Sequence, residues 1–198
     1  MDYRVARIIR WLIYILVGLL VILLLFVAYR GIMNAFKESS TSTTPTQAVN
    51  LNDYKTNGAQ LKFITDGPIV ASENHYQYVI TISATQRTVD VIKGYGQAPV
   101  TSKSFGNNQA SYDAFIAAVN SAGFANTKTA PSGATLEGQC SLGDKYSYQI
   151  VSGGSMPLNS WNTSCDTGGG TFNGRTSLTQ ELFQTQIPND YDIVGSVQ

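Results

Sequence analysis

The feature that most constrains this chain is an uncharged apolar run, Trp11–Tyr29 (WLIYILVGLLVILLLFVAY). At a rise of about 1.5 Å per residue, a helix of about 20 such residues matches the thickness of the hydrocarbon core of a bilayer. The run follows three arginines, Arg4, Arg7 and Arg10. Only Arg30 and Lys37 follow it closely, and this bias predicts a cytoplasmic N-terminus. We therefore predict that residues 1–37 form a cytoplasmic basic tip and a transmembrane anchor in the cell membrane, with the rest of the chain extracytoplasmic.

A cleaved export signal also combines basic residues with an apolar run. The apolar region of such a signal has roughly 7 to 15 residues, which is shorter than this run. Small residues at the spacing of a cleavage site are missing at its end, where Val27, Ala28, Tyr29 and Arg30 stand. We therefore expect a signal-anchor, and a single-pass protein that contacts the membrane through residues 11–29.

Residues 38–60 have the composition of a linker, since their centre (SSTSTTPTQ) is rich in Ser and Thr and nearly free of apolar residues. Such a segment buries too little surface to offset the entropy of ordering it. A flexible chain of this length has a root-mean-square reach on the order of 25 Å. The remaining residues, 61–198, are enough for one extracytoplasmic domain of ordinary size.

The charge of this domain argues against a nucleic-acid partner. Residues 61–198 contain ten acidic and seven basic side chains, and no basic stripe that could neutralise phosphates. Charged residues make up 13% of the whole chain, against about 25% in a typical globular protein. Polar surface must therefore come mostly from Ser, Thr, Asn and Gln.

The only two cysteines, Cys140 and Cys165, both fall in the part predicted to face outward. In an oxidising compartment the simplest expectation for two thiols of one domain is a disulfide. The alternative, half of a metal site, needs histidine partners, and His75 is the only histidine. We expect a disulfide and no metal.

Apolar residues alternate along several segments in the manner of strands with one buried face. The clearest is His75–Ser83, where Tyr76, Tyr78, Ile80 and Ile82 recur at every second position. The other predicted strands are Leu61–Ile64, Arg87–Tyr95, Pro99–Phe105, Lys145–Val151 and Leu158–Cys165. Short polar turns between neighbouring segments predict antiparallel hairpins.

Helical spacing is found twice in the domain. Tyr112, Phe115, Ile116 and Val119 form an amphipathic stripe, with Asn107 or Asn108 available as a cap and Gly123–Phe124 at the end. A second, shorter helix is predicted to begin with a capping box of Ser177 and Gln180 and to end at Pro188. The pattern predicts an α+β fold, with an antiparallel sheet of about five strands and two helices packed on one face.

Few residues in this sequence indicate catalysis. Apart from a perturbed acid or lysine, His75 is the only candidate for a proton shuttle near neutral pH, and Glu73 lies two residues before it. No GxSxG elbow or SxxK motif accompanies them, and a solvated histidine at a strand edge is the plainer interpretation. A His75-dependent hydrolase is therefore an alternative, and we expect a non-enzymatic protein with no cofactor.

Glycines and aromatic residues offer candidates for partner contact. Gly168, Gly169 and Gly170 lack the Gly-Lys-Ser/Thr ending of a phosphate-binding P-loop, so they are better interpreted as a connector beside Cys165. Tyr146, Tyr148 and Trp161 lie on predicted strands. If these aromatic side chains face water, they form a patch large enough for an interaction site.

The order of strands, a helix ending in Gly123 and Phe124, a Tyr-rich strand and a short Leu/Phe helix resembles the emfourin class of small protein inhibitors of metalloproteases. The likeness covers about residues 61–187. It departs from the family after the first strand, where Gly67 and Pro68 replace the expected paired glycines, so no binding residue of the family is carried over. The chain also resembles a type IV pilin, in which an apolar N-terminal helix precedes a globular domain with a disulfide near its C-terminus. A pilin has an acidic residue just inside the apolar run and a continuous helix after it; here the acidic residue is absent and a Ser/Thr linker replaces the helix.

Together these features predict a membrane-anchored extracytoplasmic protein whose domain binds another protein or an envelope component, in protease inhibition or in assembly. The alternatives are a pilin-like surface subunit and the hydrolase.

Overall fold

The computed structural model describes residues 49–56, 58–165 and 169–188, all within the unit Pro45–Gln198. Its strands are β1 (Gln60–Asp66), β2 (Tyr76–Ile82), β3 (Gln86–Lys93), β4 (Thr101–Gly106), β5 (Lys145–Ser152) and β6 (Ser155–Thr163). Its helices are α2 (Gln109–Ala122) and α3 (Thr176–Gln184), with short 3-10 turns η1 (Leu51–Tyr54) and η2 (Ser72–Asn74).

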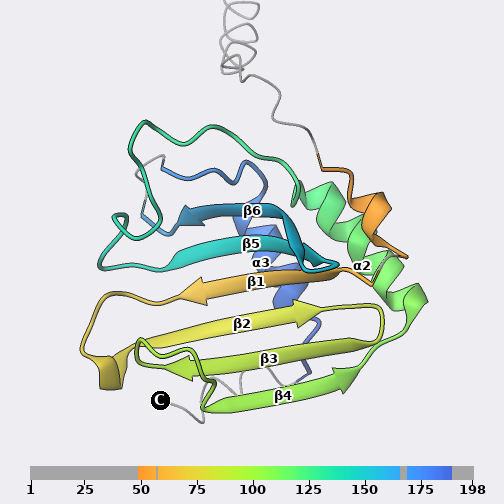
Figure 1. The fold of residues 1–198 in the computed structure, drawn as a ribbon, viewed down its shortest axis with the longest axis horizontal. Helices are drawn as coiled ribbons and strands as arrows, with labels where there is room; N and C mark the ends of the chain where they lie inside the picture. Colours follow the sequence, from red (N-terminus) through yellow and green to blue (C-terminus); the bar gives the residue numbers. More distant parts are fainter. Residues whose placement is uncertain (1–48, 57, 166–168, 189–198) are drawn as a thin grey trace, which may run out of the picture. The chain divides into compact units, whose positions relative to one another are not determined.

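The six strands form one sheet in the order β4-β3-β2-β1-β5-β6, and every neighbouring pair is antiparallel (Figure 1). Four of the strands, β2 with β3 and β5 with β6, form the two hairpins that the sequence predicts. The pairing of β1 with β5 joins segments that are far apart in the sequence, with Phe63 opposite Tyr148. The predicted α+β class and antiparallel sheet are confirmed, with six strands in place of about five.

The core lies between the sheet and the two α-helices: α3 lies behind the sheet in Figure 1, and α2, at the right of that view, contacts α3 through Phe115 and Phe183. Alternation along the strands turns one set of side chains toward these helices. On β2 and β3 the set includes Ile80, Ile82, Val89 and Val91, all of them buried. Phe183 of α3 connects the layers, since its ring contacts those of Phe63, Phe115 and Phe124. The period-2 pattern therefore identified the buried face of the hairpin.

The long helix α2 begins and ends as the sequence predicts. The side chain of Asn108 accepts a hydrogen bond from the backbone N–H of Ser111 at 2.9 Å. At the other end Gly123 adopts a left-handed φ of 82°, and the N–H of Phe124 donates to the carbonyl of Val119. This arrangement satisfies carbonyls that the last helical turn leaves free, and only glycine adopts such a φ without strain.

The last helix starts differently from the prediction. Arg175 occupies the cap position of α3 without a side-chain hydrogen bond, so the capping box at Ser177 is wrong. Ser177 lies one residue inside the helix and is exposed, while Thr179 and Phe183 form the buried face. Tertiary packing of Phe183 fixes the position of this helix, and the local capping signal does not.

The folded part reaches back into the segment 38–60 that the sequence assigns to a linker. Leu51, in η1, is fully buried in the core, as is Ala59 just before β1. The amide of Gln109 also donates to the carbonyl of Lys55, which attaches this segment to the start of α2. Isolated apolar residues within a polar stretch are enough to dock it, so the described domain begins before residue 61.

Within the described residues, no helix combines the length and the apolar character that crossing a membrane requires. The predicted anchor at residues 11–29 lies outside these residues, as do positions 38–48 of the predicted linker.

Candidate interaction site at the loop end of the sheet

The longer connections of the domain meet at one end of the sheet, which we call the loop end. Here β1, β3 and β6 finish and β2, β4 and β5 begin, at the left of Figure 1. The described loops concerned are residues 67–75, 94–100, 123–144, 164–165 and 169–175. Among the described residues, the opposite end has the short turns β2–β3 and β5–β6, the connection from β4 to α2 and the entry of the chain into β1. Loops carried by a rigid scaffold are common positions for binding residues.

Three ionisable side chains form a cluster at the base of the loop end. Asp66, the last residue of β1, places its carboxylate 3.0 Å from Nε2 of His75 and 3.1 Å from Nζ of Lys145. His75 is 3% exposed and the Lys145 side chain 7%, whereas that of Asp66 is 25% exposed. A histidine and a lysine, both almost fully buried, therefore share one partly exposed carboxylate. Burial of such polar groups requires well-placed partners to offset their desolvation.

The ring of His75 holds two loops together. Its Nδ1 donates to the carbonyl of Pro68 at 3.0 Å, because a carbonyl oxygen can only accept. Its face stacks on Tyr95, with 4.2 Å between ring centroids. The Tyr95 hydroxyl in turn donates to the carbonyl of Val70 and accepts from its N–H. Both ring nitrogens of His75 are thus engaged, which favours a structural role over proton transfer to a substrate.

The structure does not place Glu73 with His75. Glu73 is exposed on η2, while Asp66 supplies the carboxylate beside the imidazole. Sequence reasoning missed this role of Asp66 and Lys145, because the two residues come together only through the pairing of β1 with β5, where they lie directly opposite each other. The hint available in the sequence was the position of Asp66 just before a turn that leads to His75.

Replacing Asp66 with Asn should lower the free energy of unfolding by about 2 kcal/mol. Removing one partner of a buried ion pair costs about 3–5 kcal/mol, and the partial exposure of Asp66 reduces that loss. Urea denaturation of the full-length chain in detergent micelles would measure the change. Glu73→Gln, an exposed acid in the neighbouring loop, is the matched control and should stay within about 0.5 kcal/mol of the wild type. Equal losses for the two variants would contradict the role of Asp66.

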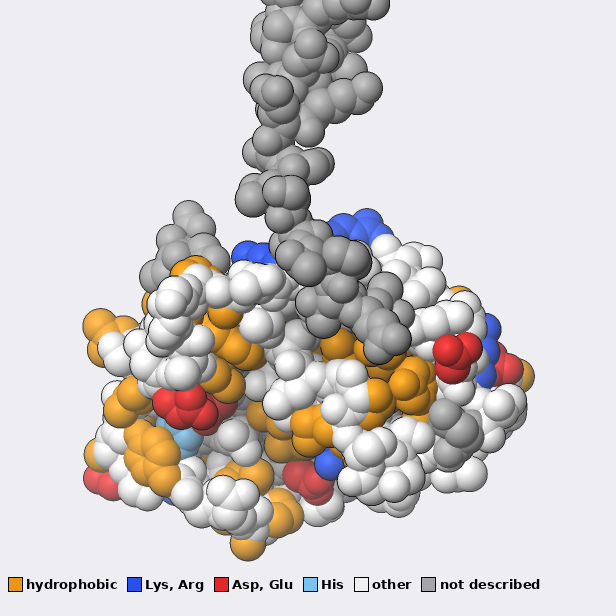
Figure 2. Space-filling model, turned by 45° about the horizontal axis from the view of Figure 1, so that its top comes forward, with side chains coloured by type: hydrophobic (Ala, Val, Ile, Leu, Met, Phe, Trp, Pro, Cys, Tyr) orange, Lys and Arg blue, Asp and Glu red, His pale blue; other side chains and the backbone are white. Residues whose placement is uncertain are grey.

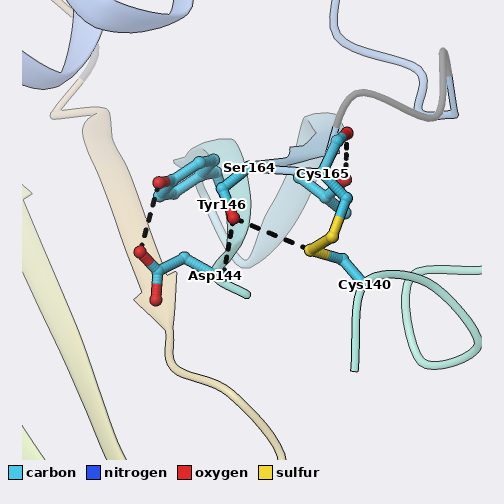
Figure 3. Close-up of a disulfide and its surroundings, with 6 residues drawn as sticks. Cys140, Asp144, Tyr146, Ser164 and Cys165 are labelled. Carbon is cyan, nitrogen blue, oxygen red and sulfur yellow. Dashed lines mark hydrogen bonds between the residues drawn. A yellow bond between two sulfur atoms is a disulfide. The ribbon is translucent and has the colours of Figure 1, made fainter. Parts of the chain in front are cut away.

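A disulfide closes the other side of the loop end (Figure 3). Cys140 and Cys165 are bonded, as predicted, with 5.5 Å between their Cα atoms. Ser164 links this bridge to β5, since its hydroxyl accepts from the N–H of Asp144 at 2.8 Å and lies 3.6 Å from Sγ of Cys140. Asp144 also accepts from the hydroxyl of Tyr146 at 3.3 Å. The loop before β5 is therefore fastened by covalent and polar contacts.

Of the aromatic residues considered for partner contact, Tyr148 is fully buried in this structure. It points toward the helices, stacks on Phe172 with 3.7 Å between centroids, and donates to Asn162. Burial raises the pKa of its hydroxyl above the usual value of about 10. Tyr146 is partly buried on the same core, and Trp161 is half-buried on β6. Tyrosine is compatible with either environment, so the period-2 pattern of β5 groups Tyr146 with Tyr148 but does not determine whether their face is buried.

The glycines after Cys165 have a structural use where the structure describes them. Gly170 is buried with a φ of 115°, and a Cβ there would lie 2.5 Å from the carbonyl of Trp161. That carbonyl accepts from the N–H groups of Thr171 and Phe172, so this segment packs along the outer edge of β6. Gly169 is half-buried, and Gly168 lies outside the described residues.

Exposed apolar side chains gather around the loop end. Ile69, Val70, Tyr95 and Leu142 form what we call the loop-end patch, with exposures from 38% for Val70 to 88% for Leu142. The N–H of Ile69 donates to the carbonyl of Ser141 at 2.8 Å, which joins the loops that carry Ile69 and Leu142. Figure 2 shows hydrophobic surface beside the histidine and acidic side chains of this region. Sequence reasoning missed the patch, because its members come from three separate loops.

A small cavity of about 170 Å³ adjoins the patch, lined by Asp66, His75, Gln77 and Tyr95 among others. A second cavity of about 420 Å³ lies along the edge of β6 and includes Val49, Lys128, Leu158 and Asn159 in its lining. Among the residues that the structure describes, no three His, Cys, Asp or Glu side chains are grouped to hold a metal ion.

Comparison with models of protein families, with curated proteins and with solved structures finds no match for this chain.

Proposed function

We propose that this chain is a single-pass membrane protein, anchored by residues 11–29 with its N-terminus in the cytoplasm, whose extracytoplasmic domain binds another protein through the loop-end patch. The observation that carries the proposal is the grouping of four exposed apolar side chains on loops that are held rigidly. A patch of this kind on a monomeric domain is typical of an interaction site.

Preorganisation supports binding by these loops. The stacking of His75 on Tyr95 and the two hydrogen bonds between Tyr95 and Val70 fix one part of the patch. The disulfide and the contact of Ile69 with Ser141 fix the other part. Loops that are already ordered lose less conformational entropy when a partner binds, so more of the contact energy appears as affinity.

The position of the patch also suits a tethered domain. The strand β1 begins with Gln60 and reaches the loop end only at Asp66. Seven residues of extended chain span roughly 20 Å, so the patch lies across the sheet from the point where the chain enters β1. Val49, the first described residue, lines a cavity with Leu158 and Asn159 in the first half of β6, so it does not occupy the loop end either.

A test compares two exposed apolar residues at opposite ends of the sheet. A photo-crosslinking amino acid at Leu142, in the loop-end patch, should capture a defined protein in cells that express the full-length chain. The same probe at Met156, beside the β5–β6 turn and 48% exposed, is the matched control and should not. Leu142→Asp should weaken that capture about tenfold, and Met156→Asp should leave it unchanged. Equal capture from both positions would contradict the proposal.

A further inference from the structure

The edge strand β4 presents an unused set of backbone hydrogen-bonding groups. It is the first strand in the order of the sheet, and within the described residues it pairs only with β3. Four of its six residues are exposed. An edge of this kind is a template onto which another extended chain can add as a further strand.

The register shows which groups point outward. The N–H of Ser83 donates to the carbonyl of Gln86, so the even-numbered residues of β3 turn their backbone groups toward β2. The N–H of Asn107 donates to the carbonyl of Thr85, which turns the odd-numbered residues of β4 toward β3. Ser102 and Ser104 therefore direct both their N–H and their C=O groups away from the sheet.

The side chains at this edge specify the charge of the added strand. Lys103 is the only charged residue of β4, and it is exposed. Lys103 pairs with Val89 of β3, so its side chain lies on the face of the sheet that the helices cover. Arg87, two positions away on β3, lies on the same face. On the other face Ser102 and Ser104 are bonded to Asp90 and Gln86. A strand with acidic residues at alternate positions would place them beside Lys103, because neighbours on adjacent strands interact across one face.

A second copy of the chain is a poorer match for this edge. Antiparallel pairing of two β4 strands that engages Ser102 with Ser104 brings the two Lys103 side chains directly opposite each other. Like charges in that position are destabilising, and an edge lysine is a common means of preventing self-association.

We propose that β4 is a second interaction surface, which binds an extended, acidic segment of a partner protein by β-strand addition. This inference is independent of the loop-end patch, since it involves neither its residues nor its loops. The backbone groups of Ser102 and Ser104 supply affinity, and Lys103 supplies the preference for acidic residues.

The probe for the test is a fluorescent peptide of about seven residues with alternating Glu and Val, together with its Lys/Val counterpart. Binding to the full-length chain in lipid nanodiscs is followed by fluorescence anisotropy. We expect the Glu/Val peptide to bind at least about tenfold more tightly than the Lys/Val peptide. Equal affinities would overturn the proposal.

Two substitutions measure separately what the backbone N–H of residue 104 and the charge of Lys103 contribute to peptide binding. Ser104→Pro removes an outward N–H without disturbing the ladder to β3, and Ser104→Ala is its matched control, since both lose the bond to Gln86. Proline should weaken binding of the Glu/Val peptide about tenfold relative to alanine. Lys103→Glu, an exposed change that leaves the backbone intact, should reverse the preference between the two peptides. Equal binding by the proline and alanine variants, or an unchanged preference, would overturn the proposal.

If a second copy of the chain or its own C-terminal segment pairs with β4, the experiments give different results. Self-association of the wild type that Ser104→Pro abolishes, measured by sedimentation, would overturn the proposal in favour of a second copy. Peptide binding that appears only after residues 189–198 are deleted would overturn it in favour of the chain's own C-terminal segment.

Discussion

Replacing Tyr148 with alanine should lower the free energy of unfolding by about 4 kcal/mol, the largest effect that we expect of any single substitution in this domain. The side chain is fully buried between Phe172, Phe63 and Phe124, so alanine leaves a cavity lined by three aromatic rings. Truncation of a buried aromatic residue costs about 3–5 kcal/mol, a large part of the 5–15 kcal/mol that stabilises a typical domain. Urea denaturation of the full-length chain, followed by near-ultraviolet circular dichroism, would measure the loss.

Tyr148→Phe is the matched control, because it keeps the ring and removes only the hydrogen bond to Asn162. A loss of about 1 kcal/mol is the expected result for that bond. The two Tyr148 variants also distinguish a role of this residue in the core from a role in binding a partner. Wild-type stability of Tyr148→Ala, combined with loss of partner capture, would show that Tyr148 acts at a surface and would contradict the packing described above.

Removing the disulfide by the double substitution Cys140→Ser and Cys165→Ser should lower the free energy of unfolding by about 3 kcal/mol. The bridge joins residues 25 positions apart, and closing a loop of that size restricts the unfolded chain by roughly this amount in the chain-entropy model. The same loss should appear when the wild type is unfolded in urea with and without a reducing agent. A difference below about 0.5 kcal/mol would contradict a stabilising role for the bridge.

A matched variant separates the bond from the backbone that carries it. Cys140 has a φ of 54°, the only positive φ at a non-glycine position among the described residues. Glycine adopts this conformation more readily than other residues. Cys140→Gly with Cys165→Ser should therefore be about 0.5–1 kcal/mol more stable than the double serine variant. The reverse order would show that the left-handed backbone at position 140 carries no strain.

The elements whose determinants are local could be predicted from the sequence. The hairpin of β2 and β3 and the caps of α2 depend on residues close to one another, and alternation or helical spacing is enough to identify them. The cap of α3 was predicted wrongly, since packing of Phe183 against the sheet determines where that helix lies. Leu51 shows the same limit, because one apolar residue in a polar segment gives no periodic signal.

The candidate site could be predicted only in part. The sequence indicated His75 and the two cysteines, which are rare residues in this chain. It gave no indication that Lys145 would share a carboxylate with His75, since that contact requires β5 to pair with β1. The exposure of Ile69 and Leu142 could not be predicted either, because the sequence does not show whether the folded chain covers an isolated apolar residue in a loop.

The central position of β1 has a consequence for how the domain folds. From β1 to β4 each strand pairs with its neighbour in sequence, so this half needs only short loops to close. The contact of Phe63 with Tyr148 closes about 85 residues of intervening chain, which has a larger entropic penalty and slows folding. The bridge between Cys140 and Cys165 lies wholly within the later half and cannot shorten that loop. Oxidation therefore secures the loop end without helping the two halves of the sheet to meet.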